Sequence, residues 1–69
     1  MLKQIDQVQI GKRLIQLRGE LTQQAVADKI GVAVSSIGAY ERGEVAPSDK
    51  VKIALADLYG KTVQEIFFD

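Results

Sequence analysis

Residues 22–43 read TQQAVADKIGVAVSSIGAYERG and predict two short helices joined by a tight turn. Thr22 is placed to cap the first helix, because its hydroxyl accepts one of the N–H groups that a helix start leaves unpaired. Gly31 supplies the positive φ of a sharp turn, and Ala27 is small enough to allow two close helix axes. The apolar residues at helical spacing are Val26, Ala27, Ile30, Ile37 and Tyr40. Together they predict a steep crossing that leaves one face of the second helix outward.

One further helix is predicted on the N-terminal side of this pair. Asp6 is its N-cap candidate, with Gln9 as the reciprocal partner three residues later, so the helix begins near Gln7. Gly19 follows the last apolar residue and ends the helix. Its buried stripe is expected at Ile10, Leu14 and Leu17.

Two more helices are predicted after the loop of residues 44–47. Ser48 caps the first of them and Gly60 ends it. The stretch Thr62–Glu65 has the T-x-x-E pattern of a capping box and opens a short last helix over about residues 63–68. The buried residues of these helices are expected to be Val51, Leu55, Leu58, Tyr59, Val63, Ile66 and Phe67. Residues 1–69 are therefore expected to form a single compact all-α domain of five helices.

The composition excludes most catalytic chemistry. The chain has 69 residues, with nine basic and nine acidic side chains, no cysteine and no histidine. Thiolate chemistry, disulfides, the usual zinc sites and imidazole acid–base catalysis are therefore excluded. No convergent cluster of carboxylates takes their place. We expect neither an enzyme nor a bound metal, cofactor or small-molecule ligand.

Net charge does not identify a binding partner, but hydropathy predicts where the protein is located. The net charge of zero lacks the basic excess that is typical of nucleic-acid-binding domains. No apolar run approaches the ~20 residues that a membrane span needs, and the N-terminal residues lack the pattern of a signal peptide. We expect a cytoplasmic protein with no membrane partner.

The sequence resembles the Cro/repressor-type (Xre-like) helix-turn-helix family along most of its length. The matching segments are Leu21–Gly31, Ser36-Ile37, Tyr40–Gly43, Pro47-Ser48 and Leu58–Gly60 with Phe67. The resemblance implies a lambda-repressor-like five-helix domain with its helix-turn-helix at about residues 22–42. It also implies a non-enzymatic, DNA-binding transcriptional regulator of bacterial or phage origin. Its third helix, about Val34–Arg42, would lie in the major groove of a palindromic operator bound by a homodimer.

The resemblance assigns roles to individual residues. Gln23, at the start of the second helix, is expected to contact a DNA phosphate, and Arg42 a phosphate or an outer base edge. The groove-facing positions of the third helix are Val34, Ser35, Gly38 and Ala39. Arg18 and Glu41 match a buried ion pair of the family whose role is structural. Phe68 is expected to face solvent, at a two-fold contact between two copies of the chain.

The third helix departs from the family in ways that weaken base recognition. Ala33 stands where a Ser or Thr cap is usual, which costs roughly 1 kcal/mol, and Gly38 inside the helix costs about as much against alanine. Valine, alanine and glycine side chains cannot form the bidentate hydrogen bonds that distinguish bases. We therefore expect modest, salt-sensitive affinity, with specificity shared between thymine methyl contacts and DNA shape.

A protein-interaction module that keeps the fold but reads bases weakly or not at all is the alternative function. The neutral charge and the apolar third helix favour this alternative. The charges around the second and third helices separate the two hypotheses. Basic groups that converge near Gln23 and Arg42 indicate DNA binding, whereas a dominance of Asp28, Glu41 and Glu44 indicates a protein partner.

Overall fold

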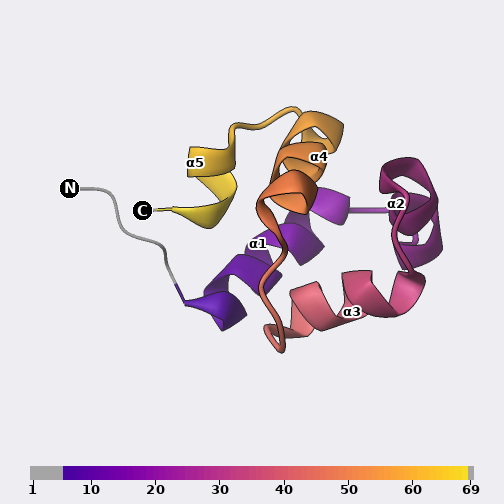
Figure 1. Cartoon of the computed structure of the whole chain (residues 1–69), viewed down its shortest axis with the longest axis horizontal. Helices are drawn as coiled ribbons and strands as arrows, with labels where there is room; N and C mark the ends of the chain where they lie inside the picture. Colours follow the sequence, from indigo (N-terminus) through magenta and orange to yellow (C-terminus); the bar gives the residue numbers. More distant parts are fainter. Residues whose placement is uncertain (1–5, 69) are drawn as a thin grey trace.

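The computed structural model describes residues 6–68 and folds them into five helices, as the sequence predicts (Figure 1). The helices are α1 Gln7–Arg18, α2 Gln23–Ile30, α3 Val34–Arg42, α4 Asp49–Tyr59 and α5 Val63–Phe67. The prediction of an all-α, five-helix fold is confirmed. The last helix is one residue shorter than expected, because Phe68 has extended backbone angles, φ −130° and ψ 159°.

Side chains cap four of the five helix starts. The capping residues are Asp6, Thr22, Ser48 and Thr62, and Ala33 forms no side-chain cap. The capping box of α5 is complete: Glu65 N donates to Thr62 Oγ1 at 3.1 Å, and Thr62 N donates to Glu65 Oε1 at 2.9 Å. The hydrogen bond from the Thr62 backbone lowers the pKa of the Glu65 carboxyl. At α1 only half of the expected box forms among residues 6–68: Gln9 N donates to Asp6 Oδ1 at 2.9 Å, but the exposed Gln9 side chain accepts no hydrogen bond from the Asp6 backbone N–H.

Apolar side chains from all five helices form one core. Its buried members are Ile10, Leu14, Val26, Ala27, Ile37, Leu55, Ala56, Ile66 and Phe67. The prediction for α4 is partly wrong, since Lys52 and Ala56 are buried while Val51, Leu58 and Tyr59 lie half-buried at the edge of the core. Helix α4 packs against α2 and against α5. Its buried face therefore includes Leu55, as expected, but is completed by Lys52 and Ala56.

Lys52 is a buried charged residue that no pattern in the sequence predicts. Its Nζ atom lies 5.5 Å from the ring centroid of Phe67 and 5.6 Å from that of Phe68. The aliphatic stem is buried, and the negative faces of the two rings attract the ammonium group. This contact joins α4 to the end of α5.

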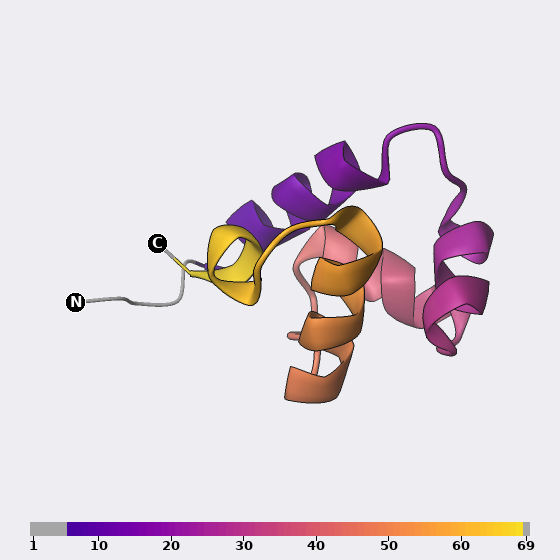
Figure 2. The same ribbon diagram turned by 90° about the horizontal axis from the view of Figure 1, so that it is seen from above.

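The helices are arranged with α2 at one end of the molecule and α5 at the other (Figures 1 and 2). Helix α1 packs most extensively against α3, and α2 packs against both α3 and α4. Figure 1 shows α3 running along the lower edge of the molecule, with α2 at a steep angle to it. The steep crossing leaves one side of α3 at the surface.

The contact between α1 and α3 depends on a glycine in the middle of α1. A Cβ atom at Gly11 would overlap the carbonyl oxygen of Glu41, 2.8 Å from its carbonyl carbon and 3.0 Å from the carbonyl oxygen of Tyr40. Gly43 makes a second close approach in the opposite direction, because its Cβ would lie 2.8 Å from Val8 Cα. The C-terminal end of α3 is therefore held against the backbone of α1 at two points.

Candidate nucleic-acid interface

The turn between α2 and α3 consists of residues 31–33. Gly31 has left-handed backbone angles, φ 75° and ψ 37°, as the sequence predicts. The backbone N–H groups of Gly31 and Val32 both donate to the carbonyl oxygen of Ala27, at 2.9 and 3.1 Å. These bonds close the end of α2 and fix the direction in which α3 begins.

The surface of α3 exposes fewer of the predicted groove-facing residues than expected. Val34 is 40% exposed and Ser35 is exposed, whereas Ala39 is half-buried. Gly38, expected to face outward, is buried. The reason is that the Arg42 side chain folds back over Gly38, with Nη1 2.8 Å from the position of a Cβ atom. The free surface of α3 therefore consists of its first turn and the Arg42 side chain.

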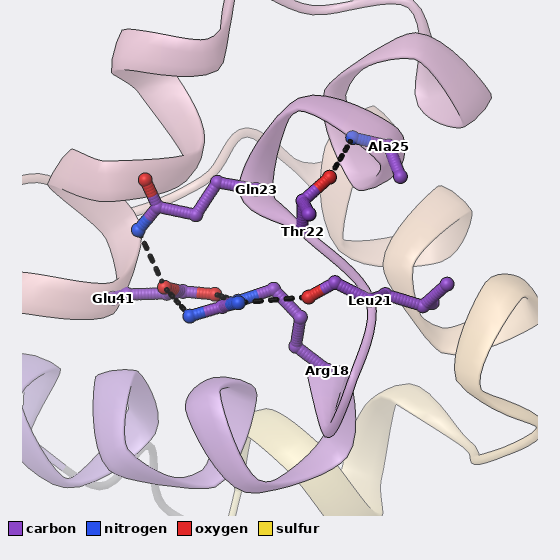
Figure 3. A network of polar contacts seen from close by, with 6 residues as sticks. All are labelled: Arg18, Leu21, Thr22, Gln23, Ala25 and Glu41. Carbon is purple, nitrogen blue, oxygen red and sulfur yellow. Dashed lines mark hydrogen bonds and ion pairs between the residues drawn. The ribbon is translucent and has the colours of Figure 1, made fainter.

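An ion pair between Arg18 and Glu41 ties α1 to α3 (Figure 3). Arg18 Nε donates to Glu41 Oε2 at 2.7 Å, and Arg18 Nη2 donates to Glu41 Oε1 at 3.2 Å. The side chains are 20% and 4% exposed, respectively. Arg18 Nη1 also donates to the carbonyl oxygen of Leu21 at 2.8 Å, which holds the short connector before α2. The hydrogen bond to Glu41 raises the pKa of Arg18.

Gln23 joins this network, which the sequence did not indicate. Its Nε2 donates to Glu41 Oε1 at 2.9 Å. Figure 3 shows the amide nitrogen turned toward Glu41 and the amide oxygen turned away from it. One of the two side-chain N–H groups expected to reach a phosphate is thus already bonded within the protein, and this bond fixes the orientation of the amide.

Tyr59 lies close to the same carboxylate. It lines a small recess with Glu41, Leu14, Ile37, Tyr40 and Leu55. Partial burial raises the pKa of the Tyr59 phenol, the charge of Glu41 raises it further, and the charge of Arg18 opposes this. The Tyr59 phenol therefore senses the charge balance of the Arg18–Glu41 pair.

Arg42 is paired with Glu44, immediately beyond the end of α3. Arg42 Nε donates to Glu44 Oε2 at 2.8 Å, and Arg42 Nη2 donates to Glu44 Oε1 at 3.1 Å. Hydrogen bonding between the two groups raises the pKa of Arg42 and lowers that of Glu44. Both side chains are exposed, so the pair lies at the surface rather than in the core.

The acidic residues near α2 and α3 do not dominate this surface. Glu41 is turned inward and neutralised by Arg18, and Glu44 is balanced by Arg42. Asp28 is exposed on α2, where its Oδ1 accepts a hydrogen bond from Gln24 Nε2 at 2.8 Å. The surface formed by α2 and α3 is therefore nearly neutral.

Phe68 lies far from this face, at the end of α5. The expectation that it faces solvent is wrong, because the ring is half-buried against the core and lies under the Lys52 ammonium. Arg13 of α1 caps the same end of the chain, its Nη1 donating to the carbonyl oxygens of Glu65, Ile66 and Phe68 at 3.0, 3.4 and 3.5 Å. A basic side chain at a helix C-terminus stabilises the unpaired carbonyls there.

Within residues 6–68, no group of three or more Asp or Glu side chains is placed to hold a metal ion. The same part of the chain contains no helix with the length and hydropathy of a membrane span.

Two steeply crossed helices joined by three residues, with one side of the second helix at the surface, define a helix-turn-helix protein. A family model described as helix-turn-helix matches residues 12–66. The chain is also 38% identical over 47 residues to an uncharacterized HTH-type transcriptional regulator of Methanocaldococcus jannaschii, a match that covers 68% of this chain and 71% of that protein. The chain belongs to the Cro/repressor-type (Xre-like) helix-turn-helix family of DNA-binding transcriptional regulators, which is not a family of enzymes.

Two solved structures are similar over most of their length. One is the restriction-modification controller protein C.AhdI from Aeromonas hydrophila, with a TM-score of 0.79, 32% identity, and coverage of 87% of this chain and 94% of that chain. The other is the DNA-binding domain of BldD, with a TM-score of 0.72, 32% identity, and coverage of 88% and 92%. The expected lambda-repressor-like fold is thereby confirmed.

Proposed function

We propose that this chain regulates transcription by binding a palindromic operator as a homodimer, with the surface of α3 in the major groove. The observation that carries the proposal is the exposed surface of α3. Val34 and Ser35 are exposed in its first turn, and Arg42 is exposed at its end. The names of similar proteins support the same reading, since they include a controller protein and a DNA-binding domain. Such a regulator acts beside its DNA, in the cytoplasm of a bacterium or an archaeon.

The charges of the face formed by α2 and α3 do not oppose DNA binding. The inward-turned Glu41 and the paired Glu44 remove two of the three acids that would have repelled phosphates. Gln23 is held at the start of α2, where a phosphate would meet its remaining amide N–H and the backbone N–H groups of the helix. The neutral face predicts weaker and less salt-dependent binding than that of a strongly basic domain.

Selection of duplexes from a random pool, carried out at two salt concentrations, tests this function. We expect a palindromic site to be enriched, and its affinity to fall as the salt concentration rises. Replacing Gln23 by alanine should weaken selected and scrambled duplexes by the same factor, roughly fivefold, because phosphate contacts carry no sequence information.

Gln24→Ala is the matched control, since Gln24 is the next residue of the same helix and its amide is bonded to Asp28. This variant should bind DNA as the parent chain does. No enrichment of any duplex at either salt concentration would contradict the proposal and favour the protein-interaction module.

The dimer is proposed to form through the surface of α4 and α5. A hollow of about 330 Å³ lies there, lined by Asp49, Lys52, Ile53, Val63 and Phe68. Ile53 is 56% exposed, the most open large apolar side chain of the described residues. A second copy that covered Ile53 and the edge of Phe68 would remove this apolar surface from water.

Sedimentation over a dilution series checks the dimer. We expect a monomer–dimer equilibrium that duplex DNA shifts toward the dimer, and Ile53→Glu should weaken it roughly tenfold or more. Val45→Glu is the control, because Val45 is 50% exposed in the loop before α4. A monomer at all concentrations, with and without duplex DNA, would show that this surface is no dimer interface.

A further inference from the structure

The Arg42 side chain lies along α3 instead of extending from its end. A Cβ atom at Gly38 would lie 2.8 Å from Arg42 Nη1, 3.6 Å from Cζ and 3.8 Å from Nη2. The guanidinium therefore covers the Gly38 backbone, one helical turn before the Cα atom of Arg42 itself. It occupies the middle of the surface that the sequence predicts to face the groove.

Gly38 provides space for this placement rather than an unusual backbone conformation. Its φ is negative, as in any helical residue, unlike the glycines that end the helices. Outside the backbone of α3 itself, the three atoms nearest to a Cβ at Gly38 all belong to the Arg42 side chain. A glycine inside a helix is unfavourable relative to alanine, and here the missing methyl group is what allows the guanidinium to approach α3 closely, with Nη1 nearest to Gly38.

Glu44 holds the guanidinium by one edge only. Its two oxygens accept from Nε and Nη2 in a bidentate pair. The terminal edge, which carries Nη1 and the second N–H of Nη2, takes no part in this pair and has no hydrogen-bond partner among residues 6–68. Two parallel N–H donors on that edge match the O6 and N7 acceptors that guanine presents in the major groove.

We propose that Arg42, lying on Gly38 and held by Glu44, reads a guanine in the major groove, and that Glu44 is the positioning residue for this contact. The inference rests on the proposed function, since it requires α3 to enter the groove. It supplies the bidentate base contact that Val34, Ser35 and Ala39 cannot make.

Charge balance favours a base over a phosphate as the ligand of Arg42. The Arg42–Glu44 pair is neutral, so a phosphate would have to compete with a carboxylate already bonded to the guanidinium. A guanine edge is uncharged and would use the terminal edge of the guanidinium, so it binds without displacing Glu44. Holding the side chain in place beforehand also lowers the entropy lost when the contact forms.

The test uses the full chain and its selected duplex, with 7-deazaguanine replacing each guanine in turn. This base lacks the N7 acceptor and keeps Watson–Crick pairing. We expect the affinity of the parent chain to fall about tenfold at one guanine of each half-site and to change little at the others.

Two variants act on the Arg42 guanidinium from different sides. Glu44→Gln removes the charge that holds the guanidinium, and Gly38→Ala places a methyl group 2.8 Å from the present position of Nη1, so that the guanidinium has to move. Each should reduce the effect of 7-deazaguanine to about threefold or less. Gly38→Ala should at the same time raise the melting temperature, because alanine is favoured inside a helix. A purely structural role of Gly38 would not lower base discrimination while raising stability.

Asp57→Asn is the control for charge, because it removes one exposed acidic group from α4. In this variant, 7-deazaguanine should reduce the affinity for the duplex by the same factor as in the parent chain. Glu44→Gln, in contrast, should lose this discrimination and also gain affinity for scrambled DNA, about threefold.

Three results would overturn the inference. A tight and selective complex in which no guanine depends on N7 would refute it and leave the proposed function standing. Retention of the full N7 effect in both Glu44→Gln and Gly38→Ala would refute the roles of these two residues. A chain that binds no duplex at all would overturn the inference and the proposed function together.

Discussion

Gly11→Ala is expected to destabilise the fold by about 3 kcal/mol, the upper range for a residue that overpacks a dense interior. The added methyl group would overlap the Glu41 carbonyl, which is backbone and cannot rotate away. Relief requires α1 and α3 to separate, which opens the contacts of Ile10 and Leu14 and strains the Arg18–Glu41 pair. Urea unfolding followed by circular dichroism measures the change.

Gly38→Ala is the matched control for this prediction. It is the same substitution inside another helix, but the atoms in its path belong to the flexible Arg42 side chain. The free energy of unfolding should therefore rise, by up to about 1 kcal/mol. A Gly11→Ala variant as stable as the parent chain would contradict the described close contact between the backbones of α1 and α3.

Glu41→Gln is expected to lower the free energy of unfolding by about 2–4 kcal/mol. The change keeps the size of the side chain but leaves the Arg18 guanidinium, whose side chain is 20% exposed, without a compensating charge at the buried Glu41 position. The amide of Gln23 loses its charged acceptor as well. Chemical denaturation compared with that of Glu44→Gln checks the value, since Glu44 belongs to an exposed pair whose loss should change stability little.

The same variant has a signature at alkaline pH. The pKa of Tyr59 is raised in the folded chain, so the unfolded chain loses this proton first, near its ordinary pKa of about 10. Stability is thus complete below that pH and falls as the pH rises toward the folded pKa. Removing the charge of Glu41 lowers the pKa of Tyr59 in the folded chain. The pKa values of the folded and unfolded chains then lie closer together, and less stability is lost at alkaline pH.

Titration of tyrosinate absorbance in a Tyr40→Phe background, where Tyr59 is the single tyrosine, measures this shift. An unchanged Tyr59 titration in the Glu41→Gln variant would contradict the described network, whatever the change in stability.

Sequence patterns predict those parts of the fold that depend on neighbours along the chain. The caps at Thr22, Ser48 and Thr62 and the turn at Gly31 need only a hydroxyl or a positive φ at a given position. Five helices and nearly all their bounds follow from such signals. The pairing of Arg18 with Glu41 required the family resemblance, because nothing local joins residues so far apart.

The features that escaped prediction depend on contacts between elements. Gly11 gives no local sign that another backbone lies against it, and Lys52 looks like a surface residue until the rings of α5 are placed beside it. The sequence assigned Gly38 and Arg42 to separate roles, one facing the groove and one at the helix end. Only the fold shows that one covers the other.

The close contact of α3 with α1 at two points has a consequence for how a complex would form. With Gly11 receiving the carbonyl end of α3 and Gly43 resting on Val8, the tilt of α3 is set before any duplex arrives. Because α3 cannot change its tilt, a duplex whose major groove does not match this tilt has to bend or twist to bind. Base steps that deform easily, even where no side chain touches them, would then contribute to which sites are chosen.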